Sequence, residues 1–466
     1  MSSDTEDIIC ARATPAGGSA IAIIRVSGNG CHALLHKIFR KKFNPGFTFK
    51  SHHAYYGTIF DNEEIIDDAL VITFSEGKSF TGEESFEINS HGSEIVIALI
   101  LRIICKTGGR LAEPGEFSKR AFLNGKIDLS EAEAIMDVVN ASTKQAANIA
   151  VKQLNGTVKN EINFIKNLVA DLLAEIEVYI DYPEEDLSLD TAVWTGAIDS
   201  IINQSNTMLN GFTRGKYIRE GIQAAILGKT NAGKSTLFNY LLNEDKAIVS
   251  DIHGTTRDYL DGVINISGYG VRLYDTAGLR KTLDPIELEG TKRAISISDK
   301  SDIVLYVLSG SEGLTDNDKV NIQSISSDKK TIIIVNKIDL IQEKKNQLIN
   351  EITNFIENHF INFRIIGMSA IQKTGIEEFN TQFIELVTNT SITESTDPII
   401  TNERHANKLL ESINSLSNAK TNMHNQILDL AAFDLRQSLN SLGEITGEIT
   451  PNDILDKIFS TFCVGK

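Results

Sequence analysis

The 466-residue sequence is poor in cysteine, proline and tryptophan, with 4, 7 and 1 of each. Its cysteines, Cys10, Cys31, Cys105 and Cys463, lie far apart, without a C-x-x-C pair or a nearby histidine cluster. This spacing excludes a disulfide framework and a zinc site, and it is typical of proteins in a reducing compartment.

Long apolar runs are also missing. The most apolar stretch, residues 95–101, is too short to span a bilayer. The acidic amino-terminal residues lack the apolar core of a signal peptide. We therefore expect a cytoplasmic protein that makes no contact with a membrane.

Positive charge is scarce as well, since the formal net charge is −17. This charge balance argues against a protein with a positively charged surface that binds nucleic acids non-specifically. A local basic run, HKIFRKKFNPGFTFKSHH, nevertheless occupies residues 36–53. It is either a solvated helix end and loop, which is the commoner case, or a local RNA-binding face.

What the sequence does contain is regular hydrophobic periodicity, of three kinds. Residues 1–120 mix short apolar runs with glycine-rich turns, which predicts an α+β domain. Residues 121–215 and 389–466 show helical spacing, as in the amphipathic segment 164–180. Between them, residues 216–388 alternate apolar strands with helical patterns, which predicts an α/β domain with a mostly parallel sheet. We therefore expect a multidomain chain in which the α/β domain is inserted into a split all-α helical domain.

A phosphate-binding loop is predicted at GKTNAGKS, residues 228–235, between an apolar strand and a helix. Its backbone N–H groups would surround phosphates at a helix N-terminus, which favours anions. The Lys234 ammonium would reach the β- and γ-phosphates, and the Ser235 hydroxyl would bind Mg²⁺. The residues expected to contact the nucleotide in this loop are Asn231, Ala232, Gly233, Lys234, Ser235 and Thr236.

Further motifs follow in the order that a guanine-nucleotide domain requires. In LYDTAGL, the Asp275 carboxylate can hold Mg²⁺ through water, and Gly278 can offer its N–H to the γ-phosphate. In IIIVNKID, the Asp339 carboxylate can accept from N1–H and the N2 amino group of guanine, a donor pair that adenine lacks. In the switch loop SDIHGTTRD, Thr256 is the expected second Mg²⁺ ligand. The nucleotide contacts expected from these motifs and from MSA are Ser250, Asp251, Ile252, His253, Gly254, Thr255, Thr256, Asp275, Thr276, Ala277, Gly278, Asn336, Lys337, Asp339, Ser369 and Ala370.

The water-orienting residue of small GTPases is missing. They carry a glutamine directly after D-T-A-G, where this sequence has Leu279. Asn231 could help to hold a monovalent cation beside the phosphates, and Glu287 could orient the attacking water. Spacing alone leaves Glu287 open to a simpler interpretation, as a surface carboxylate in the acidic stretch DPIELEG.

Motifs near both ends extend the pattern over the full length. Together, ATPAGGSAIAIIRVSG, SFTGEESFEINSHG, PGEFSKRAFLNGKIDLSEAEAI, NAGKST, DIHGTTRD, DTAGLR and the terminal FCVGK resemble the tRNA-modifying GTPase family MnmE, also called TrmE. The resemblance implies a folate-binding N-terminal domain, a split helical domain and an inserted P-loop GTPase domain. It also implies a homodimer through the N-terminal domains, with GTPase domains that meet across their switch faces when potassium and GTP are bound.

The resemblance assigns metal and catalytic roles in the GTPase domain. By motif, Ser235 and Thr256 would bind Mg²⁺, and Glu287 would be the catalytic, water-orienting residue. The residues that would surround K⁺ are Asn231, Ser250, Ile252 and Thr255.

The resemblance also implies a site for a formyl-tetrahydrofolate, a one-carbon donor, formed by Arg25, Glu87, Lys126 and Lys466. A cation can meet the glutamate tail of folate, and a carboxylate can accept from the edge of the pterin. The FCVGK tail would fold back into the helical domain near this site, and whether the Cys463 thiol takes part stays open. Thr450 is expected to cap a final helix that runs to Phe459.

The function that we expect is a potassium-dependent GTPase. It would form a heterotetramer with an FAD-dependent partner of the MnmG (GidA) family, with tRNA as the substrate. Together they would add an aminomethyl or carboxymethylaminomethyl group to carbon 5 of the wobble uridine, using 5-formyl-tetrahydrofolate or a related one-carbon folate. The alternatives are a regulatory GTPase of ribosome assembly with RNA-docking flanks, which would not need the folate motifs, and an adaptor without GTP turnover.

Overall fold

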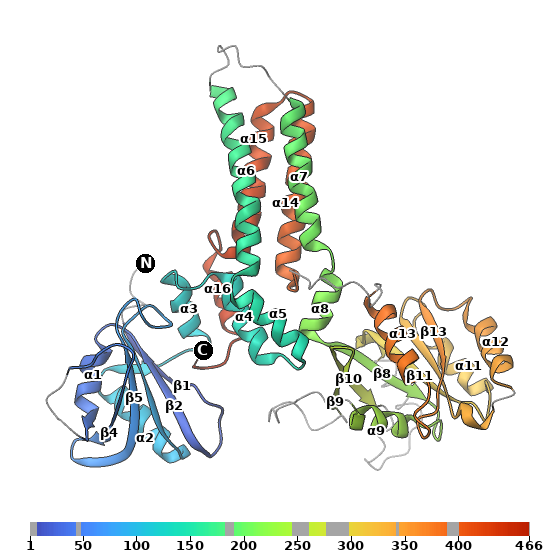
Figure 1. Ribbon diagram of the computed structural model, residues 1–466, viewed down its shortest axis with the longest axis horizontal. Coiled ribbons are helices and arrows are strands. Elements are labelled where there is room, and N and C mark those ends of the chain that lie inside the picture. The colour runs from blue at the N-terminus through green and yellow to red at the C-terminus, as the bar shows by residue number, and fades with distance from the viewer. Residues whose placement is uncertain are drawn as a thin grey trace. The chain divides into compact units, whose positions relative to one another are not determined.

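The structure is a computed structural model (Figure 1), which describes residues 7–42, 48–181, 191–244, 261–275, 298–341, 344–388 and 400–465. The chain separates into two compact units. Unit 1 comprises residues 1–136, 159–166 and 439–466, and unit 2 comprises residues 137–158 and 167–438. Within the described ranges, every helix is too short or too polar to cross a bilayer.

Unit 1 contains a seven-stranded sheet in the order β3-β4-β5-β6-β2-β1-β7. All neighbouring strands are antiparallel except β1 and β7, which are parallel. Two helices, α1 (Cys31–Ile38) and α2 (Glu94–Lys106), bury their apolar sides in one core with the sheet. The strands are β1 (Ile8–Arg12), β2 (Ser19–Ser27), β3 (Phe39–Lys41), β4 (His53–Asp61), β5 (Glu64–Phe74), β6 (Ser85–Gly92) and β7 (Gly109–Leu111). The prediction of an α+β N-terminal domain is confirmed.

Unit 1 also contains a small helical core. Helices α3 (Glu116–Leu123) and α16 (Asn452–Phe459) pack together, and α4 (Leu129–Asn140) contributes Leu129 and Ala132. The predicted start of α16 is wrong by one residue. Pro451, with φ −57° and ψ 142°, is the N-cap, and the buried Thr450 hydroxyl has no hydrogen-bond partner among the described residues. The extended Pro451 delays the first helical turn beyond the reach of Thr450.

Unit 2 contains helices from both sides of the α/β block. Lys420 of α14 pairs with Asp199 of α7 at 2.6 Å, and Arg436 of α15 pairs with Glu177 of α6 at 2.5 Å. In Figure 1, α6, α7, α14 and α15 run side by side. Outside the α/β block, the helices wholly in unit 2 are α5 (Lys144–Leu154), α7 (Thr191–Leu209), α8 (Phe212–Glu220) and α14 (Glu403–His424). Helices α6 (Thr157–Asp181) and α15 (Leu428–Thr446) belong to unit 2 except for residues 159–166 and 439–446. The predicted split of the helical region is therefore confirmed.

The inserted α/β block has a six-stranded sheet in the order β13-β12-β11-β8-β10-β9, in which only β9 is antiparallel. The central strand β11 is buried at every position, so alternate residues such as Leu305 and Tyr306 enter the two apolar cores on opposite faces. The strands are β8 (Ile222–Gly228), β9 (Asp261–Ile266), β10 (Tyr269–Asp275), β11 (Ile303–Ser309), β12 (Lys330–Asn336) and β13 (Phe363–Gly367). The described helices of the block are α9 (Lys234–Glu244), α11 (Asp316–Gln323), α12 (Lys345–Ile356) and α13 (Ile376–Thr388). The mostly parallel sheet is as predicted.

Candidate functional site

The phosphate-binding loop joins β8 to α9, and two of its glycines are required by their surroundings. Gly228 has φ +133°, and a Cβ there would lie 2.3 Å from the carbonyl oxygen of Val307. Gly233 has φ +96°, and a Cβ there would lie 2.1 Å from Nδ2 of Asn336. Any side chain at either position would be strained and would push neighbouring segments apart.

Lys234 is buried at the first position of α9, with 7% of its surface exposed. Its Nζ donates to the carbonyl oxygens of Gly228 at 2.8 Å and Lys229 at 2.5 Å. These bonds hold the ammonium against the loop at a helix N-terminus, where the helix dipole favours an anion. Ser235 and Thr236 follow in the first turn and are exposed. The loop therefore presents two hydroxyls to solvent, above an ammonium that is buried against the loop carbonyls.

The Asn336 side chain connects three separate motifs. Its Nδ2 donates to the carbonyl of Ala232 at 3.0 Å, and its Oδ1 accepts from the N–H groups of Lys337 at 2.9 Å and Ala370 at 3.1 Å. The side chain is buried, with 3% exposed. The phosphate loop, the NKID motif and the MSA motif are thus brought together, as the sequence order predicted.

Lys337 supports the same arrangement from outside. Its backbone has φ 62°, and its Nζ donates to the carbonyl of Asn231 at 2.8 Å. Asp339 lies two residues on, in the 3₁₀ turn η2 (Ile338–Leu340), and is half-buried. A carboxylate at such a turn is accessible to the edge of a base.

The MSA motif is held by a short backbone pairing. Ser369 and Thr374 exchange two backbone hydrogen bonds, of 3.1 and 3.2 Å, and both Ser369 and Ala370 are buried. Because the Ala370 N–H already donates to Asn336, a contact from this N–H to a guanine carbonyl would share the donor.

Several predicted residues cannot be placed. Asp275 ends β10 beside Ile226 of β8, and its side chain is outside the described part of the structure. The other predicted residues outside the described ranges are Ser250, Asp251, Ile252, His253, Gly254, Thr255, Thr256, Thr276, Ala277, Gly278, Glu287 and Lys466.

The candidate folate residues Arg25 and Glu87 face each other on neighbouring strands, β2 and β6. Arg25 Nε donates to Glu87 Oε1 at 2.9 Å, and about a quarter of each side chain is exposed. The Arg25 guanidinium also lies 5.9 Å from the ring centre of Phe80 and 5.8 Å from that of Phe117. Lys126 donates from Nζ to the carbonyl of Gly77 at 3.0 Å, on the loop that carries Phe80.

The carboxyl-terminal tail lies beside Arg25. Arg25 donates to the carbonyl of Gly465 at 3.2 Å, and Val464 forms an antiparallel bridge with Pro114. Gly465 has φ +95°, and a Cβ there would lie 2.3 Å from the carbonyl oxygen of Arg12. The prediction that the tail approaches the folate residues is confirmed. Its contacts, however, include the strands of the N-terminal domain as well as the helical core that Phe462 enters.

A buried ion network behind this site was missed by sequence reasoning. Arg120, with 2% exposed, pairs with Asp7 at 2.6 Å, Glu83 at 3.2 Å and Glu116 at 2.9 Å. Burial opposes ionisation of Glu116, but hydrogen bonds from Arg110, the Glu113 N–H and Arg120 outweigh it and lower the pKa of its carboxyl. The signal was present in PGEFSKRAF, since an arginine four residues after a glutamate on a helix can pair with it.

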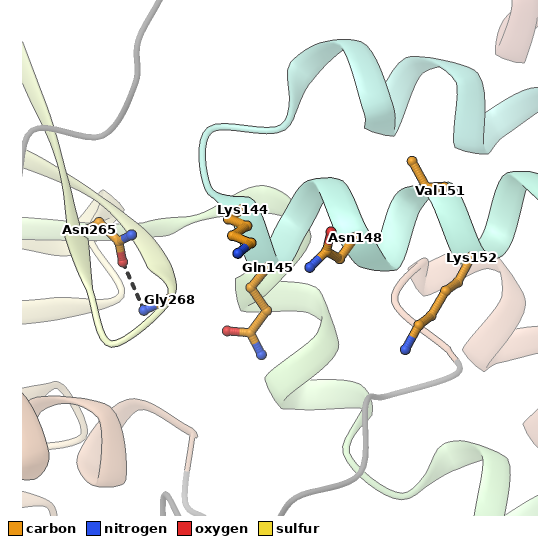
Figure 2. A pocket seen from close by; sticks show the side chains of 7 residues that line it. All are labelled: Lys144, Gln145, Asn148, Val151, Lys152, Asn265 and Gly268. Carbon is orange, nitrogen blue, oxygen red and sulfur yellow. Dashed lines mark hydrogen bonds between the residues drawn. The ribbon is translucent and has the colours of Figure 1, made fainter.

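A cleft within unit 2 is lined by none of the candidate site residues. Figure 2 shows it beside α5 and the turn that joins β9 to β10. Its volume is about 570 Å³, and the Asn265 side chain accepts from the Gly268 N–H within the turn at 2.8 Å. The lining residues are Lys144, Gln145, Asn148, Val151, Lys152, Asn265 and Gly268.

Comparison with known families covers nearly the whole chain. Residues 8–126 match the model described as "GTP-binding protein TrmE N-terminus", and residues 129–463 match that of the "MnmE helical domain". The chain belongs to the MnmE family. Membership and geometry agree on the fold class, which is an α+β N-terminal domain and a split helical domain that contains a P-loop GTPase domain.

Relatives of the family align over their full length. A protein of Acetivibrio thermocellus, named tRNA modification GTPase MnmE, is 39% identical over 465 residues, which cover 99% of each chain. One of the same name from Carboxydothermus hydrogenoformans is 40% identical over 473 residues, covering 99% of this chain and 100% of the relative. Among solved structures, a variant of Aquifex aeolicus Era bound to GDP.AlF4- aligns with a TM-score of 0.28 and 26% identity, over 42% of this chain and 66% of that chain. That score is too low to carry an argument.

Proposed function

We propose that this chain is a potassium-dependent GTPase that acts in the cytoplasm on the wobble uridine, position 34, of certain tRNAs. It would work with an FAD-dependent partner of the MnmG (GidA) family, as a heterotetramer. The product would carry an aminomethyl or carboxymethylaminomethyl group on carbon 5. Full-length membership in the MnmE family is the observation that carries this proposal.

The nucleotide site supports guanine recognition. Asn336 holds the three motifs together, and the accessible Asp339 carboxylate would accept from N1–H and the N2 amino group of guanine. Lys234 would donate to the β- and γ-phosphates, while Ser235, Thr256 and the Asp275 carboxylate would hold Mg²⁺. The remaining contacts would come from the backbone of the phosphate loop and of the switch segments.

Asn231 fits the proposed potassium site. It is exposed in the middle of the phosphate loop, and Lys337 binds its backbone carbonyl, so its side-chain oxygen stays available as a cation ligand. Ser250, Ile252 and Thr255 would complete the ligand set. K⁺ bound there would supply the positive charge that an arginine finger supplies elsewhere.

Glu287 would accept a hydrogen bond from the attacking water and aim its oxygen at the γ-phosphate. The oxygen bonds to phosphorus as the bond to the β-phosphate oxygen breaks, which leaves GDP and phosphate. Leu279 cannot take this role, because its side chain has no hydrogen-bonding atom.

The folate proposal rests on Arg25, Glu87, Lys126 and Lys466. Among the described residues, Oε2 of Glu87 has no hydrogen-bond donor, so it can accept from the pterin edge while Oε1 orients Arg25. Arg25 and Lys126 would meet the carboxylates of the glutamate tail. The one-carbon unit would come from 5-formyl-tetrahydrofolate or a related folate.

The N-terminal domain offers a surface for the proposed homodimer. Its sheet has helices α1 and α2 packed into one core, and exposed apolar side chains lie elsewhere on the strands. Tyr56 and Leu70 are paired on β4 and β5, and Ile21 and Ile65 are 61% and 72% exposed.

We also propose domain limits at 1–120, 121–215, 216–388 and 389–466.

The test is mass spectrometry of wobble uridines in cells that lack this chain. The modified uridine should disappear and return with the wild-type chain, but not with Asp339→Asn. Unchanged uridines, together with accumulated ribosomal precursors, would favour the ribosome-assembly alternative instead.

A further inference from the structure

One stretch of the N-terminal domain has a charge pattern unlike that of the rest of the chain. Residues 31–60 contain five lysines and arginines and neither aspartate nor glutamate, although the whole chain has 62 acidic residues and a net charge of −17. We call these five cations the basic rim, and they are Lys37, Arg40, Lys41, Lys42 and Lys50.

The rim lies along an edge of the sheet. Strand β3 is the last strand in the sheet order, so its outer side has no neighbouring strand. Helix α1 ends at Ile38, directly before β3, which places Lys37 in the last helical turn. Because side chains alternate along a strand, Arg40 and Lys41 project to opposite faces of the edge. Lys42 follows the strand directly, and its N–H donates to the carbonyl of Tyr56 on β4 at 3.2 Å. The cations thus surround the edge from both sides.

An aromatic cluster holds these segments in place. The ring of Phe49 lies 4.3 Å from His36, 5.4 Å from Tyr55 and 6.5 Å from Phe39, measured between ring centres. It therefore joins the end of α1, strand β3, strand β4 and the segment before Lys50. The basic rim is a built surface rather than a set of lysines on unrelated loops.

Within the described ranges, three of the cations have no carboxylate nearby to neutralise them. Lys42 pairs with Asp68 at 3.0 Å, and this hydrogen bond raises the pKa of its ammonium. In the part of the chain that the structure describes, no carboxylate lies within 4.0 Å of Lys37, Arg40 or Lys50, and all three are exposed. Arg40 is further oriented by the Phe60 ring, whose centre lies 4.1 Å from the guanidinium carbon.

We propose that the basic rim binds the phosphate backbone of RNA, specifically of the tRNA substrate. The inference rests on the proposed function and adds to it the surface that holds the substrate. Lysine and arginine bind RNA by neutralising phosphates, and arginine and aromatic rings add stacking on bases.

An acidic protein surface is the competing partner, and the rim suits it less well. Protein interfaces need an apolar centre that excludes water. Among the described residues of 31–60, Tyr56 is the only exposed large apolar side chain, and it is 45% exposed. Lys37, Arg40 and Lys50, which have no carboxylate within 4.0 Å among the described residues, fit a polyanion better than a protein interface.

The experiment measures RNA binding by the full-length chain. The probe is a fluorescently labelled, unmodified tRNA transcript with uridine at position 34, titrated at several salt concentrations. The test variant combines Lys37→Ala, Arg40→Ala and Lys50→Ala. The control variant removes the same charge from exposed cations of the GTPase domain that have no carboxylate within 4.0 Å among the described residues, with Lys300→Ala, Lys344→Ala and Arg364→Ala.

Near 0.1 M salt, the test variant should bind the transcript at least about tenfold more weakly than the wild type. The slope of log Kd plotted against log salt concentration should fall by about 2 to 3, since each phosphate contact contributes about 0.7 to 0.9. The control variant should keep most of the affinity. Arg40→Lys alone should also keep it, because it preserves the charge; circular dichroism of each variant checks folding. GTP hydrolysis should be unchanged in all of them.

Wild-type affinity in a folded test variant would overturn the inference, as would an equal loss in the control. So would a test variant that binds the transcript normally but loses binding to an acidic protein or to MnmG. These outcomes leave the proposed function standing if wild-type chain still restores modified uridine. Loss of that restoration with intact RNA binding would overturn the proposed function instead.

Discussion

At the scale of single residues, the amide of Asn336 shows how the nucleotide site is assembled. Its two polar atoms bind backbone groups of Ala232, Lys337 and Ala370, which belong to three different motifs. A carboxylate at this position could not donate to the Ala232 carbonyl, and an alanine would leave buried backbone groups unpaired. Asn336 therefore holds the motifs of the site together, while the Asp339 carboxylate is available to bind the guanine base.

Asp339→Asn is expected to weaken GTP binding about tenfold to a hundredfold, because a charged hydrogen bond contributes about 1.5 to 3 kcal/mol. The amide keeps one acceptor and introduces a donor that faces the donors of guanine. Titration with a fluorescent GTP analogue measures the effect. Xanthosine triphosphate, which has a carbonyl in place of the amino group, should bind the variant better than the wild type. Unchanged affinity for GTP would remove Asp339 from guanine recognition.

Glu287→Ala is expected to keep GTP affinity and lose most turnover. Orientation of the water matters in the transition state and little in nucleotide binding. Single-turnover hydrolysis and nucleotide titration, made on the same preparation, separate the two effects. Glu287→Gln serves as a control, since it keeps a hydrogen-bond acceptor. A parallel loss of binding and turnover would contradict the assigned role.

Potassium dependence follows from Asn231 and from the missing glutamine at Leu279. The cation would replace an arginine finger, whose contribution elsewhere is about 10³ to 10⁵ in rate. Turnover should fall strongly when potassium is replaced by sodium at equal ionic strength. Asn231→Ala should lose most of the difference between the two salts. Equal rates in both buffers for the wild type would exclude the proposed site.

At the scale of elements, the hairpin of β9 and β10 connects the two predicted switch segments. Strand β9 starts at Asp261, soon after the SDIHGTTRD loop, and β10 ends at Asp275 of the DTAG motif. The turn between them packs against α5, since a Cβ on Gly268 would lie 2.2 Å from Oε1 of Gln145. This packing is internal to unit 2, and it gives the turn a fixed support on a helix.

Gly268→Ala should destabilise this turn by about 1 to 2 kcal/mol, because φ is +95° and an L-residue is strained there. The clash with Gln145 should add to the cost. Calorimetric unfolding of the full chain measures the shift. Adding Gln145→Ala should recover the stability lost to the clash and leave the stability lost to the strained backbone at residue 268. An unchanged transition for Gly268→Ala would show that the turn rearranges freely.

At the scale of the whole molecule, the carboxyl-terminal tail packs against the N-terminal domain in unit 1. The carbonyl of Gly465 binds Arg25, 440 residues away in sequence, and the carbonyl of Cys463 accepts from Gly115 at 3.4 Å. Cys463 is exposed, so it is not a buried structural cysteine. Its main described contact is through the backbone.

Deletion of 463–466 should therefore abolish uridine modification and leave GTP hydrolysis nearly intact. The deletion removes the Gly465 carbonyl from Arg25, whereas the GTPase sheet has its own cores. Cys463→Ser is the matched variant, because it keeps the backbone contacts. It should retain modification unless the thiol acts as a nucleophile, since a serine hydroxyl is far less acidic. Normal modified uridine with the deleted chain would mean that the tail has no role here.

Features that depend on neighbours along the chain could be predicted from the sequence. The strand, loop and helix around Gly228 and Lys234 were predictable, because glycine spacing and apolar periodicity act within a few residues. The helical pattern at 164–180 and the parallel sheet were predictable for the same reason. The predicted cap of α16 is wrong, because Pro451, rather than Thr450, occupies the N-cap.

Which distant residues share a surface depends on the folded chain and could not be predicted from the sequence. Nothing local in the sequence shows that Arg25 pairs with Glu87, that Arg120 also meets Asp7 and Glu83, or that the tail reaches Arg25. These contacts depend on strand register and on the burial of charge, which makes a partner necessary but does not say which one. The basic rim shows the same limit. Its charges are visible in the sequence, but the edge strand and the ring of Phe49 make them one surface.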